Sequence, residues 1–125
     1  GEDVRNLGEK EMARIPKKLY GPVAIATGPA TVYTVPALTK TIVRHIHINN
    51  PSASPVTVTL SIGADAAGTR LYDVYSIPAK AAGVTDSARD IYPYLVMDAA
   101  EILTLSAGTN NILVIAIYGD EIVLG

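Results

Sequence analysis

The sequence predicts an all-β protein, an antiparallel β-sandwich of the jelly-roll kind with an extended or partly helical N-terminal arm. From Thr31 onward, short runs rich in Val, Ile and Thr alternate with Gly, Pro, Asn and Asp at intervals of roughly ten residues. Helical periodicity does not appear between these runs, which disfavours alternating β-α units. The chain is 49% hydrophobic without Trp or Phe, so small and β-branched side chains must fill a thin core. Its 125 residues correspond to one domain.

The first twenty residues differ from the rest because they carry nine of the 22 charged side chains. We therefore predict an N-terminal arm over residues 1–22 and a sandwich domain over residues 23–125. Pro16 and the Gly21-Pro22 pair would interrupt a helix, and the EKEMARI segment allows one or two helical turns at most. The arm is expected either to be disordered or to become ordered on a neighbouring subunit.

Seven or eight strands are expected after the arm. The runs that predict them lie at residues 31–35, 39–50, 55–63, 69–77, 91–98, 101–107 and 110–124. The third run alternates most clearly, since Val56, Val58, Leu60 and Ile62 share one face and Thr57, Thr59 and Ser61 share the other. Pro93 predicts an edge strand or a bulge in its run, because proline cannot donate a ladder hydrogen bond. The SAGTNN segment predicts a hairpin turn between the last two runs.

The last run contains NILVIAIYG, which is apolar on both faces. One face of an antiparallel sheet usually meets water. The outer face of this strand is therefore expected to be covered by another subunit, although a loop or the arm could also cover it. The predicted interface combines residues of the arm with residues of this strand: Arg14, Ile15, Lys17, Lys18, Leu19, Tyr20, Leu113, Ile115 and Ile117.

Both histidines lie in the segment TIVRHIHINN. If Ile42, Ile46 and Ile48 face the core, His45 and His47 share the opposite face with Val43 and Asn49. An HxH pair begins many metal sites, and a small cupin-like metalloprotein is one alternative. The sequence has no third histidine and no glutamate shortly after His47, although a later Asp or Glu could supply a third ligand. We interpret the pair as the polar side of a strand and expect no metal and no other cofactor.

Other function classes find little support in the composition. The net charge of −2 argues against binding to nucleic acid, and no apolar run is long enough to span a membrane. The chain has no cysteine, no GxSxG nucleophile motif and no phosphate-binding loop, so we expect no catalytic residues and no enzyme activity. Tyrosine suits both cores and contact surfaces. The possible ligand-binding residues are Tyr72, Tyr75, Tyr92 and Tyr94.

Residues 13–75 resemble a group of small virion proteins of tailed bacteriophages. The similarity lies in the segments KKLYGPVAIAT, VYTVPA, TIVRHIHINN and VTVTLSIGADAAGTRL. The resemblance implies a non-enzymatic structural protein, a capsid decoration, head-tail or tail accessory protein that is assembled in the host cytoplasm and resides in the virion. Its implied partners are further copies of itself, as a trimer, and other virion proteins such as the major capsid or tail proteins. A host-glycan-binding module of a tail or head fibre is the alternative.

Overall fold

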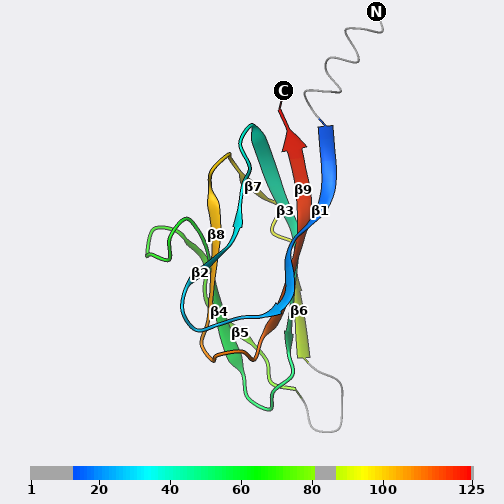
Figure 1. Ribbon diagram of the computed structural model, residues 1–125. Helices are drawn as coiled ribbons and strands as arrows, with labels where there is room; N and C mark the ends of the chain where they lie inside the picture. The colour runs from blue at the N-terminus through cyan, green and yellow to red at the C-terminus, as the bar shows by residue number, and fades with distance from the viewer. Residues whose placement is uncertain (1–12, 81–86, 125) are drawn as a thin grey trace, which may run out of the picture.

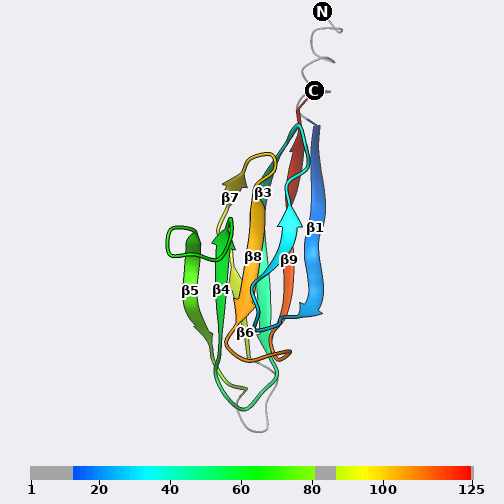
Figure 2. The same ribbon diagram turned by 60° about the vertical axis from the view of Figure 1, so that its left-hand side comes forward.

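The computed structural model describes residues 13–80 and 87–124, which form two antiparallel sheets packed face to face (Figure 1). The predicted antiparallel β-sandwich is confirmed. The first sheet has the order β1 (Ala13–Ala24), β9 (Val114–Val123), β3 (Thr39–Asn50) and β6 (Ser87–Ile91), and β7 (Leu95–Met97) also pairs with β3. The second sheet, seen side by side in Figure 2, has the order β2 (Ala30–Thr34), β8 (Ile102–Ala107), β4 (Val56–Ile62) and β5 (Arg70–Ile77).

The strand order is that of a jelly roll. Early strands pair with late ones in a nested series: β1 with β9, β2 with β8, β3 with β6 and β7, and β4 with β5. The series resembles one long hairpin whose two halves are rolled up together. Successive strand pairs are placed in alternate sheets. Further pairing of β3 with β9 and of β4 with β8 joins these pairs into the two sheets. Among the described residues, no helix is long and apolar enough to cross a membrane.

The core lies between the two sheets and is built from alternate residues of the strands. In β4, Val56, Val58 and Leu60 point inward and are at most 3% exposed, as the alternation predicts. Ser61, which the alternation places outward, is instead buried, after a register shift between Leu60 and Ser61 in the pairing with β5. Truncating a side chain of this kind to alanine typically costs about 2–5 kcal/mol. The largest fully buried apolar side chains come from both sheets and from the loops that join them: Ile46, Ile48, Ile77, Met97, Leu103, Leu105, Leu113, Ile115, Ile117, Val35 and Val43.

The sandwich begins earlier than the sequence analysis placed it. Residues 13–22, which we assigned to the arm, form most of β1, and Leu19 packs in the core. Because β1 is an edge strand, it tolerates Pro16 and Pro22, whose missing N–H groups need no partner on the open side. The helical turn considered for the EKEMARI segment is therefore absent from its last three residues, which are β-strand. The rest of the predicted arm, residues 1–12, lies outside the described residues.

Two of the charged residues that suggested an arm, Arg14 and Lys17, have partners inside the sandwich. Arg14 Nε lies 2.8 Å from Asp120 Oδ2, and Lys17 Nζ lies 3.1 Å from Glu121 Oε1. Asp120 and Glu121 are consecutive residues of β9, and both are buried. A buried carboxylate requires a cation or hydrogen-bond donors beside it. Arg14 and Lys17 of β1 therefore neutralise the buried carboxylates of β9. This pairing explains why the edge strand β1 is charged.

A β-bulge changes which residues of β3 face the core. The register shifts between Val43 and His45, so Arg44 is the extra residue. Before the bulge Val43 is buried and Ile42 points outward, and after it Ile46 is buried. The predicted inward position of Ile42 and outward position of Val43 are therefore wrong. Strict alternation misassigns them because one inserted residue reverses the faces of everything before it.

Two loops also differ from the sequence prediction. The expected run at 91–98 contains β7 and only the last residue of β6, a strand that begins at Ser87 and was not predicted. Both strands pair with β3, and Pro93 lies between them, in agreement with the predicted interruption at an edge. The SAGTNN segment does not form a hairpin turn, because β8 and β9 belong to different sheets. It crosses from one sheet to the other, and the backbone N–H of Asn111 donates to the carbonyl of Ile25 at 2.9 Å.

Candidate functional site

The outer face of the first sheet, directed away from the second sheet, carries both histidines. His45 and His47 lie on β3 after the bulge and point outward, as predicted. Asp90 of β6 is the register partner of His47, so its side chain stands on the same face. The strand pairing thus brings Asp90 beside two histidines that lie more than forty positions before it in the sequence.

The carboxylate of Asp90 binds both imidazoles. Oδ1 of Asp90 lies 2.7 Å from His45 Nε2 and 2.7 Å from His47 Nδ1. The ligand atoms of the three residues all lie within 4.8 Å of one another. Hydrogen bonds from His47 and from His45 hold the pKa of Asp90 below its ordinary value, because they stabilise the charged carboxylate. The side chains of the three are 30–43% exposed, so solvent reaches the group.

Two tyrosines hold the ring of His45 from its two sides. Tyr92 stacks on it with ring centroids 4.7 Å apart and an interplanar angle of 8°, and Tyr118, its register partner on β9, lies 5.6 Å away. Tyr118 follows the inward-facing Ile117, so its ring faces outward beside the histidines. Stacking of this kind restricts the imidazole to one orientation. The histidine pair is therefore built into a row of aromatic rings.

Exposed apolar side chains continue this row over the outer face. Val96 of β7 stands opposite Ile42 of β3 and is 60% exposed. Tyr92 is also 60% exposed and Tyr118 is 37% exposed. We call Ile42, Tyr92, Val96 and Tyr118 the aromatic band. Apolar residues gathered on one sheet face, rather than scattered singly, are typical of contact surfaces.

A second ionic group lies in the same sheet and has a structural role. Asp120 Oδ2 lies 2.5 Å from Arg14 Nη2 and 3.1 Å from Arg44 Nε, so two guanidinium groups cover this carboxylate from the outer face. On the inner side, Tyr33 donates its hydroxyl hydrogen to Glu121 Oε2. Burial, together with this hydrogen bond, raises the pKa of Tyr33 to about 12. Both acids have close partners, so the group accounts for two charged residues in a central strand.

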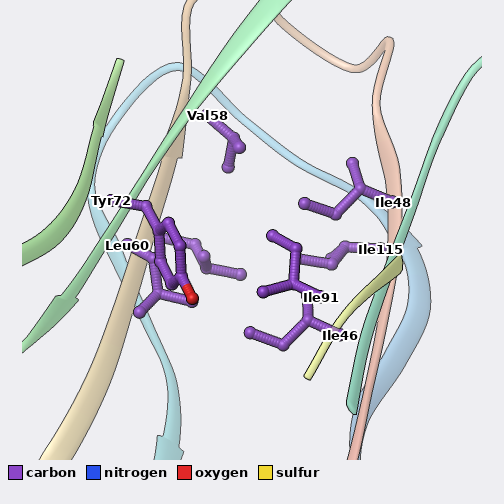
Figure 3. A pocket seen from close by; sticks show the side chains of 8 residues that line it. Ile46, Ile48, Val58, Leu60, Tyr72, Ile91 and Ile115 are labelled. Atoms are coloured by element: carbon purple, nitrogen blue, oxygen red, sulfur yellow. The ribbon is translucent and has the colours of Figure 1, made fainter. Parts of the chain in front are cut away.

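A narrow apolar gap opens between the two sheets. Figure 3 shows side chains of both layers pointing toward each other across it, with the Tyr72 ring at one wall. The residues that line it are Ile46, Ile48, Val58, Leu60, Tyr72, Ile91, Leu105 and Ile115. The lining is aliphatic apart from the tyrosine, so the gap is part of the core and offers little chemistry.

The four tyrosines considered as ligand-binding residues separate into two pairs. Tyr72 and Tyr75 of β5 form an edge-to-face pair 5.8 Å apart and pack partly buried against the core. Tyr92 and Tyr94 lie between β6 and β7 and are 60% and 63% exposed. The structure therefore does not bring the four rings to one surface.

The residues assigned to an interface also separate. Leu113, Ile115 and Ile117 are fully buried in the core of this chain, and Leu19 is 8% exposed. Leu113 lies just before β9, and Ile115 and Ile117 are inward-facing residues of that strand. We no longer assign them to an interface. The remaining residues of that set are partly or largely exposed along β1: Arg14, Ile15, Lys17, Lys18 and Tyr20. The sequence did not indicate that the residues of the aromatic band and Asp90 lie on one surface.

Comparison with known proteins identifies similar folds. No protein-family model matches the sequence, and no curated protein is similar to it in sequence. A subunit structure of Bacillus endospore appendages, described as disulfide-linked pili, is 9% identical with a TM-score of 0.52, and the match covers 91% of each chain. At this identity the likeness shows the fold alone.

Two viral structures are more distant matches. A particle of the extra small virus of the freshwater prawn Macrobrachium rosenbergii is 12% identical with a TM-score of 0.45, covering 91% of this chain and 82% of that one. The capsid of cyanophage Pam1 is 15% identical with a TM-score of 0.40, covering 88% and 81%.

Proposed function

We propose that this chain is a non-enzymatic structural subunit of a tailed-phage virion, which associates with copies of itself and docks on other virion proteins. The observation that carries the proposal is the aromatic band on the outer face of the first sheet. Tyr92 and Val96 leave 60% of their surface in water in the isolated chain, beside Tyr118. Burial of apolar surface is worth about 25 cal/mol per Å², so covering this face favours association.

The occupant that we propose for the band is a second copy of the chain. The band lies on the face of a sheet, and sheets pack well face to face at about 10 Å. The Bacillus endospore appendages that share the fold form disulfide-linked pili. This chain has no cysteine, so disulfide bonds cannot link its copies. The resemblance to small phage virion proteins supplies the particle on which the oligomer would dock.

Sedimentation of the full chain tests the association. We expect the wild type to sediment as a homo-oligomer and the double variant Tyr92→Ser, Val96→Ser to approach the monomer mass of 13.1 kDa. Leu71→Ser is the matched control, because Leu71 is 47% exposed on β5 of the other sheet. Far-UV circular dichroism verifies that each variant is folded. A wild type that stays monomeric at about 100 µM contradicts the proposal. Its free energy of association would then be about −5 kcal/mol or weaker.

Docking needs a separate measurement on particles. Virions that lack the protein are mixed with the purified chain, and bound chain is measured after the particles are sedimented. We expect saturable binding by the wild type and by Leu71→Ser. If association creates the multivalent form, the double variant should bind at least about tenfold more weakly. Equal binding by the double variant would show that the aromatic band does not contribute.

Host-glycan binding is the second candidate, and the exposed pair Tyr92 and Tyr94 favours it. Tyrosine rings that project from a loop are suited to stacking on sugar rings. Tyr94→Ala distinguishes the two functions, because Tyr94 is not part of the aromatic band. Loss of binding on a glycan array with an unchanged sedimentation mass would support the glycan. An array without hits for the wild type would contradict it.

A further inference from the structure

We propose that His45, His47 and Asp90 bind a divalent transition-metal ion such as Zn²⁺ on the outer face of the first sheet. The proposal goes beyond the structural role above and does not depend on it. Two imidazole nitrogens and one carboxylate oxygen converge within 4.8 Å, and all three ligands come from two adjacent strands.

The ligand set matches the chemistry of such ions. Imidazole nitrogen and carboxylate oxygen are both first-choice ligands for Zn²⁺, and three protein ligands are the usual number where one position remains open. Soft thiolate ligands are not required. The hard ions Ca²⁺ and Mg²⁺ prefer sites built from oxygen atoms. The expected order of preference therefore favours Zn²⁺, Co²⁺ and Ni²⁺ over Ca²⁺ and Mg²⁺.

The distances from Asp90 to the two imidazoles fit an ion after a small movement. Ligand atoms about 2.0 Å from a tetrahedral ion are about 3.3 Å from one another. The present separations of Asp90 Oδ1 from His45 Nε2 and His47 Nδ1 are 2.7 Å, so each must open by about 0.6 Å. His47 and Asp90 are 43% exposed on the surface, and rotation of these side chains meets little resistance.

The surroundings prepare the site. His45 is held between Tyr92 and Tyr118, which orients its ring before an ion arrives. The backbone positions are equally constrained, since Asp90 is paired in register with His47 on the neighbouring strand. Ordered ligands lower the conformational entropy that binding must overcome. Because the three side chains are partly exposed, the remaining positions of the ion are open to water.

Titration of the full chain with metal tests the site. The protein is prepared without a histidine tag and treated with a chelator, and ZnCl₂ is added in a calorimeter. CoCl₂ is added in parallel, and its visible absorption reports the coordination geometry. We expect one Zn²⁺ per chain and the intense cobalt bands of a four-coordinate site with nitrogen ligands. CaCl₂ and MgCl₂ are expected to give no binding under the same conditions.

Variants locate the ion. His47→Ala and Asp90→Asn should each weaken Zn²⁺ binding at least about tenfold. Loss of a residue that only orients a metal ligand already lowers metal affinity by about tenfold or more, and loss of the ligand itself should lower it at least as much. His47→Gln is a second variant of the same ligand, in case the alanine variant is poorly folded. Asp98→Asn is the matched control, because Asp98 is a surface carboxylate that contacts Lys40 at 2.9 Å and lies outside the three ligands. Its affinity for Zn²⁺ should be unchanged.

Two results would overturn the proposal. The first is no saturable binding of the wild type at about 100 µM Zn²⁺, an affinity weaker than about −5 kcal/mol. The second is binding that is equally tight in Asp90→Asn and in the folded variants at His47, which would place the ion elsewhere.

Discussion

Replacing Asn50 with aspartate is a sensitive test of the packing at the end of β3. The Asn50 side chain is fully buried, and its Nδ2 group donates to three carbonyls: those of Ser54 at 2.9 Å, Ile77 at 3.2 Å and Pro78 at 3.1 Å. Its Oδ1 accepts from Ser52, both from the backbone N–H at 3.0 Å and from the hydroxyl at 2.8 Å. One amide therefore ties the end of β3 to the loop that follows it and to the end of β5.

Asn50→Asp preserves the shape and the accepting oxygen but replaces the donating group with an oxygen. Two N–H donors are lost and three buried carbonyls face a carboxyl oxygen instead. A buried polar group left without its partner costs about 1–3 kcal/mol, so the loss of two donors predicts a decrease of about 2–6 kcal/mol in unfolding free energy at pH 7. We expect about 4 kcal/mol, which is a large share of the 5–15 kcal/mol typical of a domain.

The loss should depend on pH with a definite sign. Burial and the three carbonyls disfavour the charged form, so the introduced carboxyl has a higher pKa folded than its value of about 3.9 when unfolded. An acid whose pKa is raised in the folded state lowers the unfolding free energy least when the pH is below its pKa in the unfolded state. The loss of unfolding free energy grows as the pH rises toward its pKa in the folded state. The difference in stability between wild type and Asn50→Asp should therefore be smaller at pH 4 than at pH 7.

Urea unfolding followed by far-UV circular dichroism at equal protein concentration measures the difference at both pH values. Asn110→Asp is the control, because Asn110 is exposed and its Oδ1 accepts from the Thr27 N–H at 3.2 Å, a bond that aspartate retains. The control should lie within about 0.5 kcal/mol of the wild type. A loss below about 1 kcal/mol for Asn50→Asp, or a loss that increases on acidification, refutes the reasoning.

Two further substitutions test the first sheet. Gly119→Ala should lower the unfolding free energy by at least about 2 kcal/mol in the same urea assay, because an added Cβ would overlap the backbone carbonyl of Ile42 on the adjacent strand. Tyr33→Phe should change the pH dependence of thermal unfolding, since the pKa of Tyr33 is raised to about 12 by burial and by Glu121. The contribution of Tyr33 is fully present below pH 10 and is lost as pH rises to about 12, so the difference from Tyr33→Phe should shrink over that range.

For each of these substitutions, one result would contradict the expected effect. Gly68→Ala is the control for Gly119→Ala, since a Cβ on Gly68 would meet no atom within 4 Å. Equal stability of the two variants would mean that β3 and β9 are less tightly packed than described. A stability difference between wild type and Tyr33→Phe that stays constant from pH 8 to pH 12 would show that the Tyr33 hydroxyl is not buried against Glu121 in solution.

The periodicity of the sequence was sufficient to predict the fold class and the position of most strands. The alternation of Val56, Val58 and Leu60 identified an inward face because a strand repeats every two residues. The bulge at Arg44 could not be predicted, because nothing local to TIVRHIHINN specifies an inserted residue. The identity of Ile42 as an outward residue follows from that bulge alone.

The first strand was missed because its residues look like those of a solvated segment. Arg14 and Lys17 fit a strand because they pair with Asp120 and Glu121, and the residues of each pair are separated by more than one hundred positions. Two adjacent acids inside an apolar run were the available signal, since buried carboxylates require partners.

The sequence was interpreted against a metal, and the residues of the candidate site could be predicted only in part. HxH on a strand placed both imidazoles on one face, and the structure agrees. Asp90 could not be selected among the acidic residues, because the register between β3 and β6 depends on the whole sheet. The segment SARDI, which forms β6, has little apolar alternation and gave no strand signal of its own.

The nested pairing has a consequence for how the chain is made. β1 is hydrogen-bonded to β9, with Ala13 opposite Val123, and β9 separates it from β3. The first of these strands to leave the ribosome must therefore wait for the last. At about 5–20 residues per second, the roughly one hundred residues between them take on the order of 5–20 s to synthesise. A nascent chain that stops before β9 leaves its N-terminal strand without a neighbour to join, so incomplete chains are expected to be targets for chaperones and proteases.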